Sequence, residues 1–261
     1  MNILEQIIEY KRSEVADAKA AVSISSLEKT DLFLRETLSL KQFLQDKDRT
    51  GIIAEFKRRS PSKGIINEKA NVVEVTKAYT DHGASGISVL TDNNFFGGSN
   101  EDLLAARVNA VPILRKEFIV DEYQIIEAKA IGADVILLIA ACLTPREVEQ
   151  FAHLAKSLNL EVLLELHDES ELGHVCNEVD LIGVNNRNLK TFKVDLDQSI
   201  RLADRIGNGK LKIAESGISD LKNIAYLKQY GFDGFLIGEH FMRQEDPAAS
   251  FEKFIQELRA N

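Results

Sequence analysis

The chain has 261 residues, of which 44% are hydrophobic and 28% are charged, a balance that is ordinary for a folded globular protein and excludes a disordered one. Lysine and arginine number 32 and aspartate and glutamate 41, so the formal net charge is −9. Because an acidic chain repels polyanions, we expect no binding to nucleic acid or to an anionic membrane, and any bound anion needs basic groups that are gathered locally.

Cysteine usage and the N-terminal residues bear on the location of the protein. Cys142 and Cys176 are the only cysteines, too few for a disulfide framework. The chain reaches a charge at Glu5 with no apolar secretory segment before it, and the longest apolar run, residues 135–143, covers less than half of a membrane span. We therefore expect a cytoplasmic protein with no membrane contact, which is a monomer or a weak homo-oligomer.

Residues 1–50 precede the first predicted strand and contain two groups of apolar residues. They are Ile3, Leu4, Ile7 and Ile8 in one helical stripe, and Leu38, Phe43 and Leu44 in the other group. No linker rich in proline, glycine or serine separates this segment from the rest of the chain. We therefore predict extra helices that pack on the body of the protein, not a second domain.

From residue 51 to the end, short apolar runs alternate with amphipathic segments. The runs cover residues 52–54, 87–90, 112–114, 135–139, 162–164, 181–184, 211–214 and 235–237. Continuous apolar runs are typical of strands in a parallel sheet whose faces are both covered by helices. The segments between them have helical periodicity, and residues 144–147 combine a capping threonine, a proline and a glutamate that together mark a helix start.

The pattern predicts the α/β fold class and a (βα)8 TIM barrel, because βα units repeat through about 210 residues. A doubly wound open sheet is the alternative, but its first strand commonly leads into a glycine-rich turn. Here the first strand leads into the basic residues 57–59. We predict a single domain in which residues 51–261 form the barrel and residues 1–50 a helical extension.

In such a barrel the catalytic residues lie where the strands end. Glu55 and Lys57 end the first strand and share one face, because alternate residues of a strand point the same way. Lys116 follows the third run, and Glu165 interrupts the fifth, where a partly desolvated carboxylate is costly unless it is paired or acts as a base. The structural alternatives are a solvated turn, a surface lysine and a salt-bridged core acid.

The last three strands end in residues suited to an anionic substrate. Asn185 and Arg187 can orient a polar group, arginine through paired hydrogen bonds to a carboxylate or a phosphate. Ser216, Gly217 and Gly238 let backbone N–H groups face an anion, which is the common phosphate site of the fold. An asparagine-rich turn and ordinary glycine turns are the alternatives. The histidines are scattered and no nucleotide-binding glycine motif occurs, so we expect neither a metal nor a cofactor.

Six motifs, taken together, resemble those of the indole-3-glycerol phosphate synthase family. In family order they are AEFKRRSPSKG at 54–64, ISVLTD at 87–92, LRKEFI at 114–119, VNNRNL at 184–189, AESGI at 214–218 and FLIGE at 235–239. The resemblance implies a phosphosugar substrate, 1-(2-carboxyphenylamino)-1-deoxyribulose 5-phosphate. It also implies a ring closure with loss of carbon dioxide and water that yields indole-3-glycerol phosphate in tryptophan biosynthesis, without a cofactor or metal.

The resemblance also implies roles for single residues. Lys116 would be the general acid that protonates the substrate carbonyl, and Glu165 the general base. Glu55 would hold the lysines, and Lys57 would contact the substrate near its phosphate. Which lysine is the acid in the dehydration step stays open. Positions that match the substrate and phosphate contacts are Ser60, Phe118, Asn185, Arg187, Leu189, Glu215, Ser216, Gly217, Gly238 and Glu239.

Two other functions stay open at this point. One is a phosphoribosylanthranilate isomerase or another phosphate-binding barrel, which the Glu55, Lys57 and Lys116 set fits less well. The other is a phosphosugar-binding module without catalysis.

An anionic substrate also requires a positive mouth on an acidic body. The basic residues expected at this mouth are Lys57, Arg58, Arg59, Lys63, Lys116 and Arg187.

Overall fold

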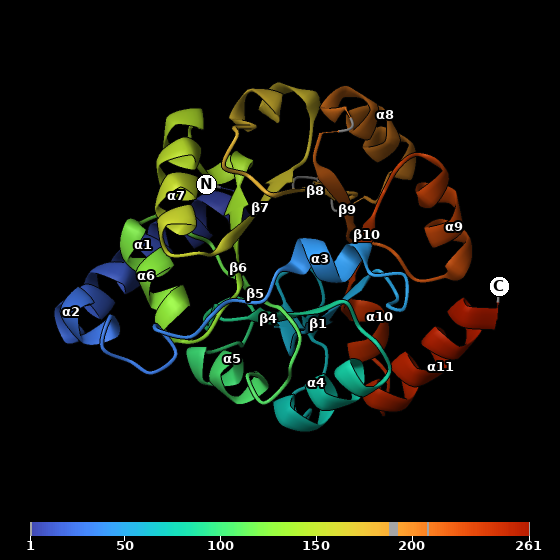
Figure 1. Cartoon of the computed structure of the whole chain (residues 1–261), viewed down its shortest axis with the longest axis horizontal. Coiled ribbons are helices and arrows are strands. Elements are labelled where there is room, and N and C mark those ends of the chain that lie inside the picture. The colour runs from blue at the N-terminus through green and yellow to red at the C-terminus, as the bar shows by residue number, and fades with distance from the viewer. Residues whose placement is uncertain (1, 188–192, 208, 261) are drawn as a thin grey trace.

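The computed structural model describes residues 2–187, 193–207 and 209–260, and its centre is a closed barrel of eight parallel strands (Figure 1). The strands are β1 (Ile52–Phe56), β4 (Gly86–Leu90), β5 (Ile113–Lys116), β6 (Val135–Ile139), β7 (Glu161–Leu166), β8 (Leu181–Asn185), β9 (Leu211–Glu215) and β10 (Gly234–Ile237). Each pairs with the next one in the chain, and β1 pairs with both β4 and β10, which closes the ring. The predicted TIM barrel is therefore confirmed.

Helices cover the outside of the barrel. They are α4 (Val72–Asp81), α5 (Asn100–Ala106), α6 (Glu122–Ala130), α7 (Pro145–Ser157), η2 (Glu169–His174), α8 (Leu196–Ile206), α9 (Leu221–Gln229) and α11 (Pro247–Ala260). Helix α7 begins with the predicted capping box, formed by Thr144 and Glu147, and buries Val148 and Phe151. Burial of one such side chain contributes about 1.5–3 kcal/mol. No helix in the described residues has the length and apolar character needed to cross a membrane.

The inside of the barrel changes from apolar to polar along each strand, because alternate residues point inward. In β7, Leu163 belongs to the interior core, and Glu165 points to the same side two residues later. In β9, Ile213 and Glu215 repeat this step. Lys116 ends β5 in the same way. The apolar core therefore fills the barrel toward the amino ends of the strands, and charged side chains lie together at the carboxyl ends.

The predicted N-terminal helices are present and lie at both ends of the barrel. Helix α3 (Leu40–Gln45) crosses the barrel centre in Figure 1, where Leu40 and Leu44 join the interior core around Ile53. Helix α1 (Ile3–Ala21) lies at the opposite end, and α2 (Ile24–Leu27) follows it. The remaining short elements are the hairpin β2 (Arg59–Ser60) and β3 (Gly64–Ile65), the turn η1 (Ala140–Cys142) and α10 (Glu239–Met242).

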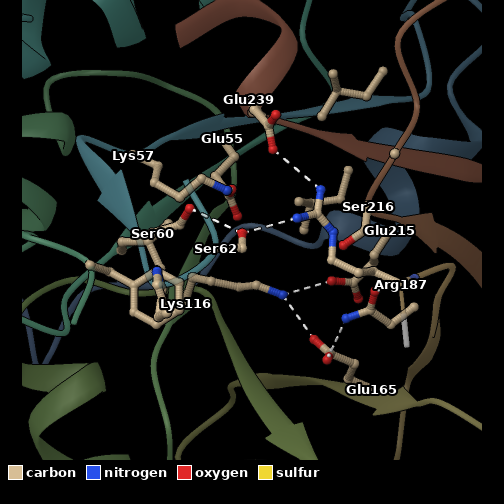
Figure 2. Close-up of a pocket in the computed structure, with 18 of the residues that line it drawn as sticks. Glu55, Lys57, Ser60, Ser62, Lys116, Glu165, Arg187, Glu215, Ser216 and Glu239 are labelled. Atoms are coloured by element: carbon tan, nitrogen blue, oxygen red, sulfur yellow. Dashed lines mark hydrogen bonds and ion pairs between the residues drawn. The ribbon is translucent and has the colours of Figure 1, made fainter. Parts of the chain in front are cut away.

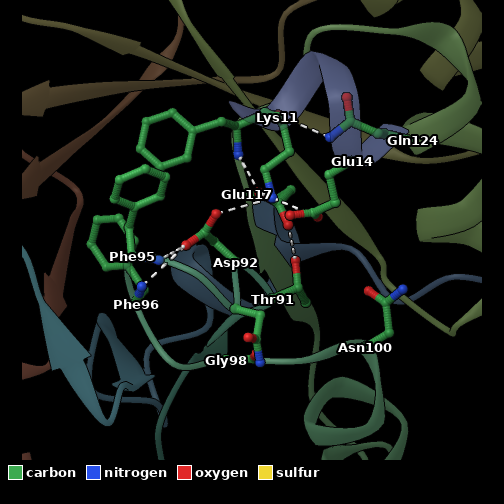
Figure 3. A network of polar contacts seen from close by, with 12 residues as sticks. Lys11, Glu14, Thr91, Asp92, Phe95, Phe96, Gly98, Asn100, Glu117 and Gln124 are labelled. Atoms are coloured by element: carbon green, nitrogen blue, oxygen red, sulfur yellow. Dashed lines mark hydrogen bonds and ion pairs between the residues drawn. The ribbon is translucent and has the colours of Figure 1, made fainter. Parts of the chain in front are cut away.

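Helix α1 is fixed to the barrel by the ammonium of Lys11, of which only 1% of the side chain is exposed (Figure 3). Lys11 Nζ lies 2.8 Å from Glu14 Oε1, 3.0 Å from Asp92 Oδ2 and 3.0 Å from Glu117 Oε1. Burial lowers the pKa of Lys11, but the three carboxylates outweigh burial and raise it. Asp92 Oδ1 also accepts the backbone N–H of Phe96 at 3.1 Å. Lys11 thus joins α1 to the residues that follow β4 and β5.

Candidate functional site

A cavity of about 360 Å³ opens at the carboxyl ends of the strands (Figure 2). Every predicted site residue that the structure describes lines this cavity: Glu55, Lys57, Ser60, Lys116, Phe118, Glu165, Asn185, Arg187, Glu215, Ser216, Gly217, Gly238 and Glu239. Leu189, the remaining prediction, lies outside the described residues. Side chains predicted from separate strand ends are therefore brought together around one space.

The ammonium of Lys116 lies between two carboxylates, as Figure 2 shows. Its Nζ is 3.0 Å from Glu165 Oε2 and 2.6 Å from Glu215 Oε2, and 16% of the Lys116 side chain is exposed. Burial lowers the pKa of Lys116, but the carboxylates of Glu165, Glu215 and Glu55 outweigh burial and raise it. Lys116 is therefore an ammonium at neutral pH, at the centre of the cavity lining.

The two carboxyl groups that contact Lys116 have pKa values shifted in opposite directions. Burial raises the pKa of Glu165, but the charge of Lys116 and the contact with His167 outweigh burial and hold it well below its usual value. Burial raises the pKa of Glu215 to about 7, against the opposing charge of Lys116. Asn185 Nδ2 also donates to Glu165 Oε1 at 2.9 Å. Two acids with separated pKa values are the usual basis for acid and base roles in one site.

Glu55 and Lys57 form the second ion pair of the cavity. Lys57 Nζ lies 2.5 Å from Glu55 Oε1, and Glu55 is buried. A Cβ atom at residue 238 would lie 2.7 Å from Glu55 Oε1, so Gly238 leaves the space that this carboxylate fills. The predicted pairing across one strand face is therefore present, and a glycine after β10 is required by its close approach to β1.

The turn after β9 has an unusual backbone. Ser216 has a φ of +69° and Gly217 a φ of +71°, which is the left-handed region that side chains other than glycine rarely adopt. Asn186 Nδ2 donates to the Ser216 carbonyl at 2.8 Å and holds this conformation. Both residues line the cavity together with Glu239 at the start of α10. Strained backbone of this kind concentrates at ligand-binding sites.

The cavity lining has no excess of basic residues, which differs from the expected positive mouth. The lining contains five glutamates and four lysine or arginine residues. Arg187 pairs with Glu239 at 3.3 Å and donates to Ser62 Oγ at 3.0 Å. Arg58 instead makes two hydrogen bonds to Asp102, at 2.5 and 2.9 Å, away from the lining. Ion pairs with Asp102 and Glu239 thus neutralise two arginines whose positive charge the sequence pattern had assigned to the cavity.

Three features of this site were missing from the sequence interpretation. Ile3, Leu4 and Ile7 of α1 line the cavity, whereas their stripe predicted only packing. Arg243 also lines it, from the segment that follows α10. His167 lies 3.1 Å from Glu165, and strand periodicity contained the signal for it, because residues two apart share a face. Within the residues that the structure describes, no cluster of three or more His, Cys, Asp or Glu could hold a metal ion.

The comparisons with known proteins agree with one another. The family model for indole-3-glycerol phosphate synthase matches residues 4–254. A relative of that name from Bacteroides thetaiotaomicron is 46% identical over 259 residues, which cover 99% of this chain and 99% of the relative. One from Acinetobacter baylyi is 40% identical over 254 residues, covering 95% of this chain and 94% of the relative.

A solved structure of a mutant tryptophan synthase alpha-subunit from Pyrococcus furiosus is similar in fold. The two structures align with a TM-score of 0.62 and 14% sequence identity, and the alignment covers 82% of this chain and 99% of the solved one. At this identity the similarity shows the barrel fold and carries no information on the reaction.

Proposed function

The chain belongs to the indole-3-glycerol phosphate synthase family, whose members are carboxy-lyases of tryptophan biosynthesis, and we propose the substrate and residue roles of its reaction. The substrate is 1-(2-carboxyphenylamino)-1-deoxyribulose 5-phosphate. The aromatic carbon that bears the carboxylate attacks the ketone carbon, carbon dioxide leaves, and loss of water then forms the indole ring. The observation that supports this proposal is the ammonium of Lys116 between Glu165 and Glu215 in the cavity.

Lys116 acts as the general acid in the ring closure. The ketone oxygen gains negative charge as the new carbon–carbon bond forms, and an ammonium beside it can donate a proton. The bound ketone replaces one carboxylate partner of Lys116, and loss of that negative charge makes the ammonium a better proton donor. The raised pKa of Lys116 keeps the proton available until the substrate arrives.

Glu165 acts as the general base. Its pKa lies well below the usual value, so it is ionised at neutral pH and can accept a proton. After the hydroxyl leaves the new five-membered ring, a proton must leave the adjacent ring carbon to give the indole. Asn185 and Lys116 hold the two oxygens of Glu165 for this step, at 2.9 and 3.0 Å.

The rest of the lining binds the substrate. Lys57, held by Glu55, contacts it near the phosphate, and backbone N–H groups of the turns after β9 and β10 bind the phosphate itself. We assign substrate contacts to Ser60, Phe118, Asn185, Arg187, Leu189, Glu215, Ser216, Gly217, Gly238 and Glu239. This set contacts both the anionic ends and the aromatic ring of the substrate.

A turnover assay tests the proposal. The purified protein should convert the named substrate to a product with indole fluorescence, while an isomerase or a binding module would give none. Lys116→Met and Glu165→Gln should each lower kcat by about 10²–10⁴-fold, the usual share of one acid or base. Glu161→Gln is the matched control, because Glu161 lies at the other end of β7 and accepts the hydroxyl of Ser39. Wild-type protein without indole product would overturn the proposal.

A further inference from the structure

His167 lies behind the carboxylate of Glu165 and is almost buried. It directly follows β7, two residues after Glu165, so the alternation of the strand brings the two side chains to the same side. His167 Nε2 lies 3.1 Å from Glu165 Oε1, and His167 Nδ1 lies 3.6 Å from Glu171 Oε2 in η2. Only 10% of its side chain is exposed. Each ring nitrogen therefore faces a carboxylate oxygen.

Neither ring nitrogen has a hydrogen-bond partner with good geometry among the described residues, and the two nearby carboxylates favour the protonated ring. A neutral imidazole has one N–H and one nitrogen lone pair, and the lone pair would face a negatively charged oxygen on one side or the other. The imidazolium has an N–H on both sides and attracts both carboxylates. Burial lowers the pKa of His167, but Glu165 and Glu171 outweigh burial and raise it to about 10. His167 is therefore a positive charge at neutral pH.

The position of His167 is fixed from its backbone. The N–H of His167 donates to Glu171 Oε2 at 2.6 Å, and Gln198 Nε2 of α8 donates to the His167 carbonyl at 3.2 Å. His167 does not line the cavity, unlike Lys116. Substrate that enters the cavity can therefore draw Lys116 away from Glu165, while His167 keeps its place.

We propose that His167 is a positioning residue: a fixed positive charge that keeps Glu165 ionised and oriented while Lys116 turns to the substrate. This inference rests on the proposed role of Glu165 as general base. Without His167, and with Lys116 turned to the substrate, Glu165 would lie near the carboxylate of Glu215 with the neutral amide of Asn185 as its remaining donor.

The other groups around Glu165 do not replace this charge. Lys116 comes from β5, Glu215 from β9 and Glu55 from β1, and only the first of them is positive. The thiol of Cys142 in η1 is near both Glu165 and Glu171, but burial and these carboxylates raise its pKa, so it stays neutral. Glu171 stands on the far side of the His167 ring and balances its charge.

The charge of the ring is measured without turnover, by NMR titration of nitrogen-15-labelled histidine, with the His167→Gln spectrum used for assignment. We expect both ring nitrogens of His167 to stay protonated to about pH 8, well above the ordinary histidine value. Glu171→Gln keeps an acceptor in place but removes one negative charge, so the ring should lose its proton at a lower pH than in the wild type. A ring that is neutral at about pH 7 in the wild type would overturn the proposal.

The effect on catalysis is measured by the pH dependence of kcat with the named substrate. In His167→Gln the acidic limb should move upward by about one pH unit or more, because an opposite charge at this distance lowers a carboxyl pKa by that amount. KM should change little, since His167 does not line the cavity. A limb that stays at the wild-type position would contradict the inference.

Two control variants separate charge from structure. His174→Gln changes a histidine of the same segment whose ring contacts the carbonyls of Glu171 and Leu143, each at 2.9 Å. His153→Gln changes an exposed histidine of α7. Neither should move the acidic limb, and a shift in His174→Gln equal to that in His167→Gln would refute the charge argument. Absence of indole product from the wild type would refute the proposed function, whereas the NMR titration would still decide the charge of His167.

Discussion

Lys11→Met should lower the free energy of unfolding far more than the loss of an exposed ion pair would. Methionine keeps most of the apolar stem of Lys11 but removes the ammonium that Glu14, Asp92 and Glu117 share. Asp92 and Glu117 are buried, so their charges would remain without the positive group at the centre of Figure 3. Removal of one partner from a buried ion pair costs about 3–5 kcal/mol.

The remaining contacts place the expected loss at the lower end of that range. Asp92 Oδ1 keeps two backbone N–H groups of residues 95–96, at 2.7 and 3.1 Å. Glu117 keeps the hydroxyl of Thr91 and the N–H of Phe118, at 2.7 and 2.8 Å. Asp92 Oδ2 has no hydrogen-bond partner among the described residues besides its ion pair with Lys11. We therefore expect a loss of about 3 kcal/mol in the free energy of unfolding.

Urea unfolding of three variants tests this value. Lys19→Met is the matched control on the same helix, because Lys19 pairs with Asp121 at 2.6 Å while 45% and 32% of the two side chains are exposed. The control should lose no more than about 1 kcal/mol. The triple change Lys11→Met, Asp92→Asn and Glu117→Gln should recover much of the loss, since it also removes the buried negative charges.

The pH dependence adds a second check. The raised pKa of Lys11 means that its contribution is complete at neutral pH and is lost only as the pH rises through that raised value. The difference in stability between the wild type and Lys11→Met should therefore persist through neutral pH and shrink only in alkaline solution. Equal losses in Lys11→Met and Lys19→Met would refute the argument.

Three further predictions concern the cavity. Since burial raises the pKa of Glu215 from 4.5 to about 7, wild-type stability should fall as the pH rises through this interval, and urea midpoints of Glu215→Gln should fall less. Gly217→Ala places a Cβ atom 2.5 Å from a Val194 methyl at a φ of +71°, so it should raise KM and cost about 1–3 kcal/mol in unfolding measurements. Arg187→Met removes the bonds to Ser62 and Glu239, and steady-state kinetics should show KM raised about tenfold with a smaller change in kcat.

The barrel and the cavity lining were predictable from the sequence because both follow from local rules. Each predicted apolar run overlaps a strand of the barrel, and polar residues at the run ends project toward one mouth. Alternation along a strand was enough to place Glu55 and Lys57 together. The same rule applied to Glu165 would have found His167, so that omission was one of interpretation and not of information.

The pairing of charges was not predictable, because it depends on contacts between distant segments. Lys116 binds Glu215, which lies 99 residues away in the chain. Arg58, which the basic run assigned to the mouth, finds Asp102 at a separation of 44 residues. No pattern in the sequence singles out Lys11, and only the fold shows that it is buried among carboxylates. Local periodicity gives the direction of a side chain, and the partner is set by the whole barrel.

Burial and the nearby carboxylates of Glu165 and Glu55 explain why Glu215 is the carboxyl whose pKa is raised toward neutrality. Around Glu215, ion pairs join Lys57, Lys116 and His167 to Glu55, Glu165, Glu171 and Glu215 itself. The charge of Lys116 opposes this shift but does not cancel it, and the pKa of Glu215 is raised to about 7. Lys116 therefore touches one acid that stays ionised and another that exchanges its proton near neutrality. The proposed reaction both donates and accepts protons, and two acids with separated pKa values beside one ammonium group suit it.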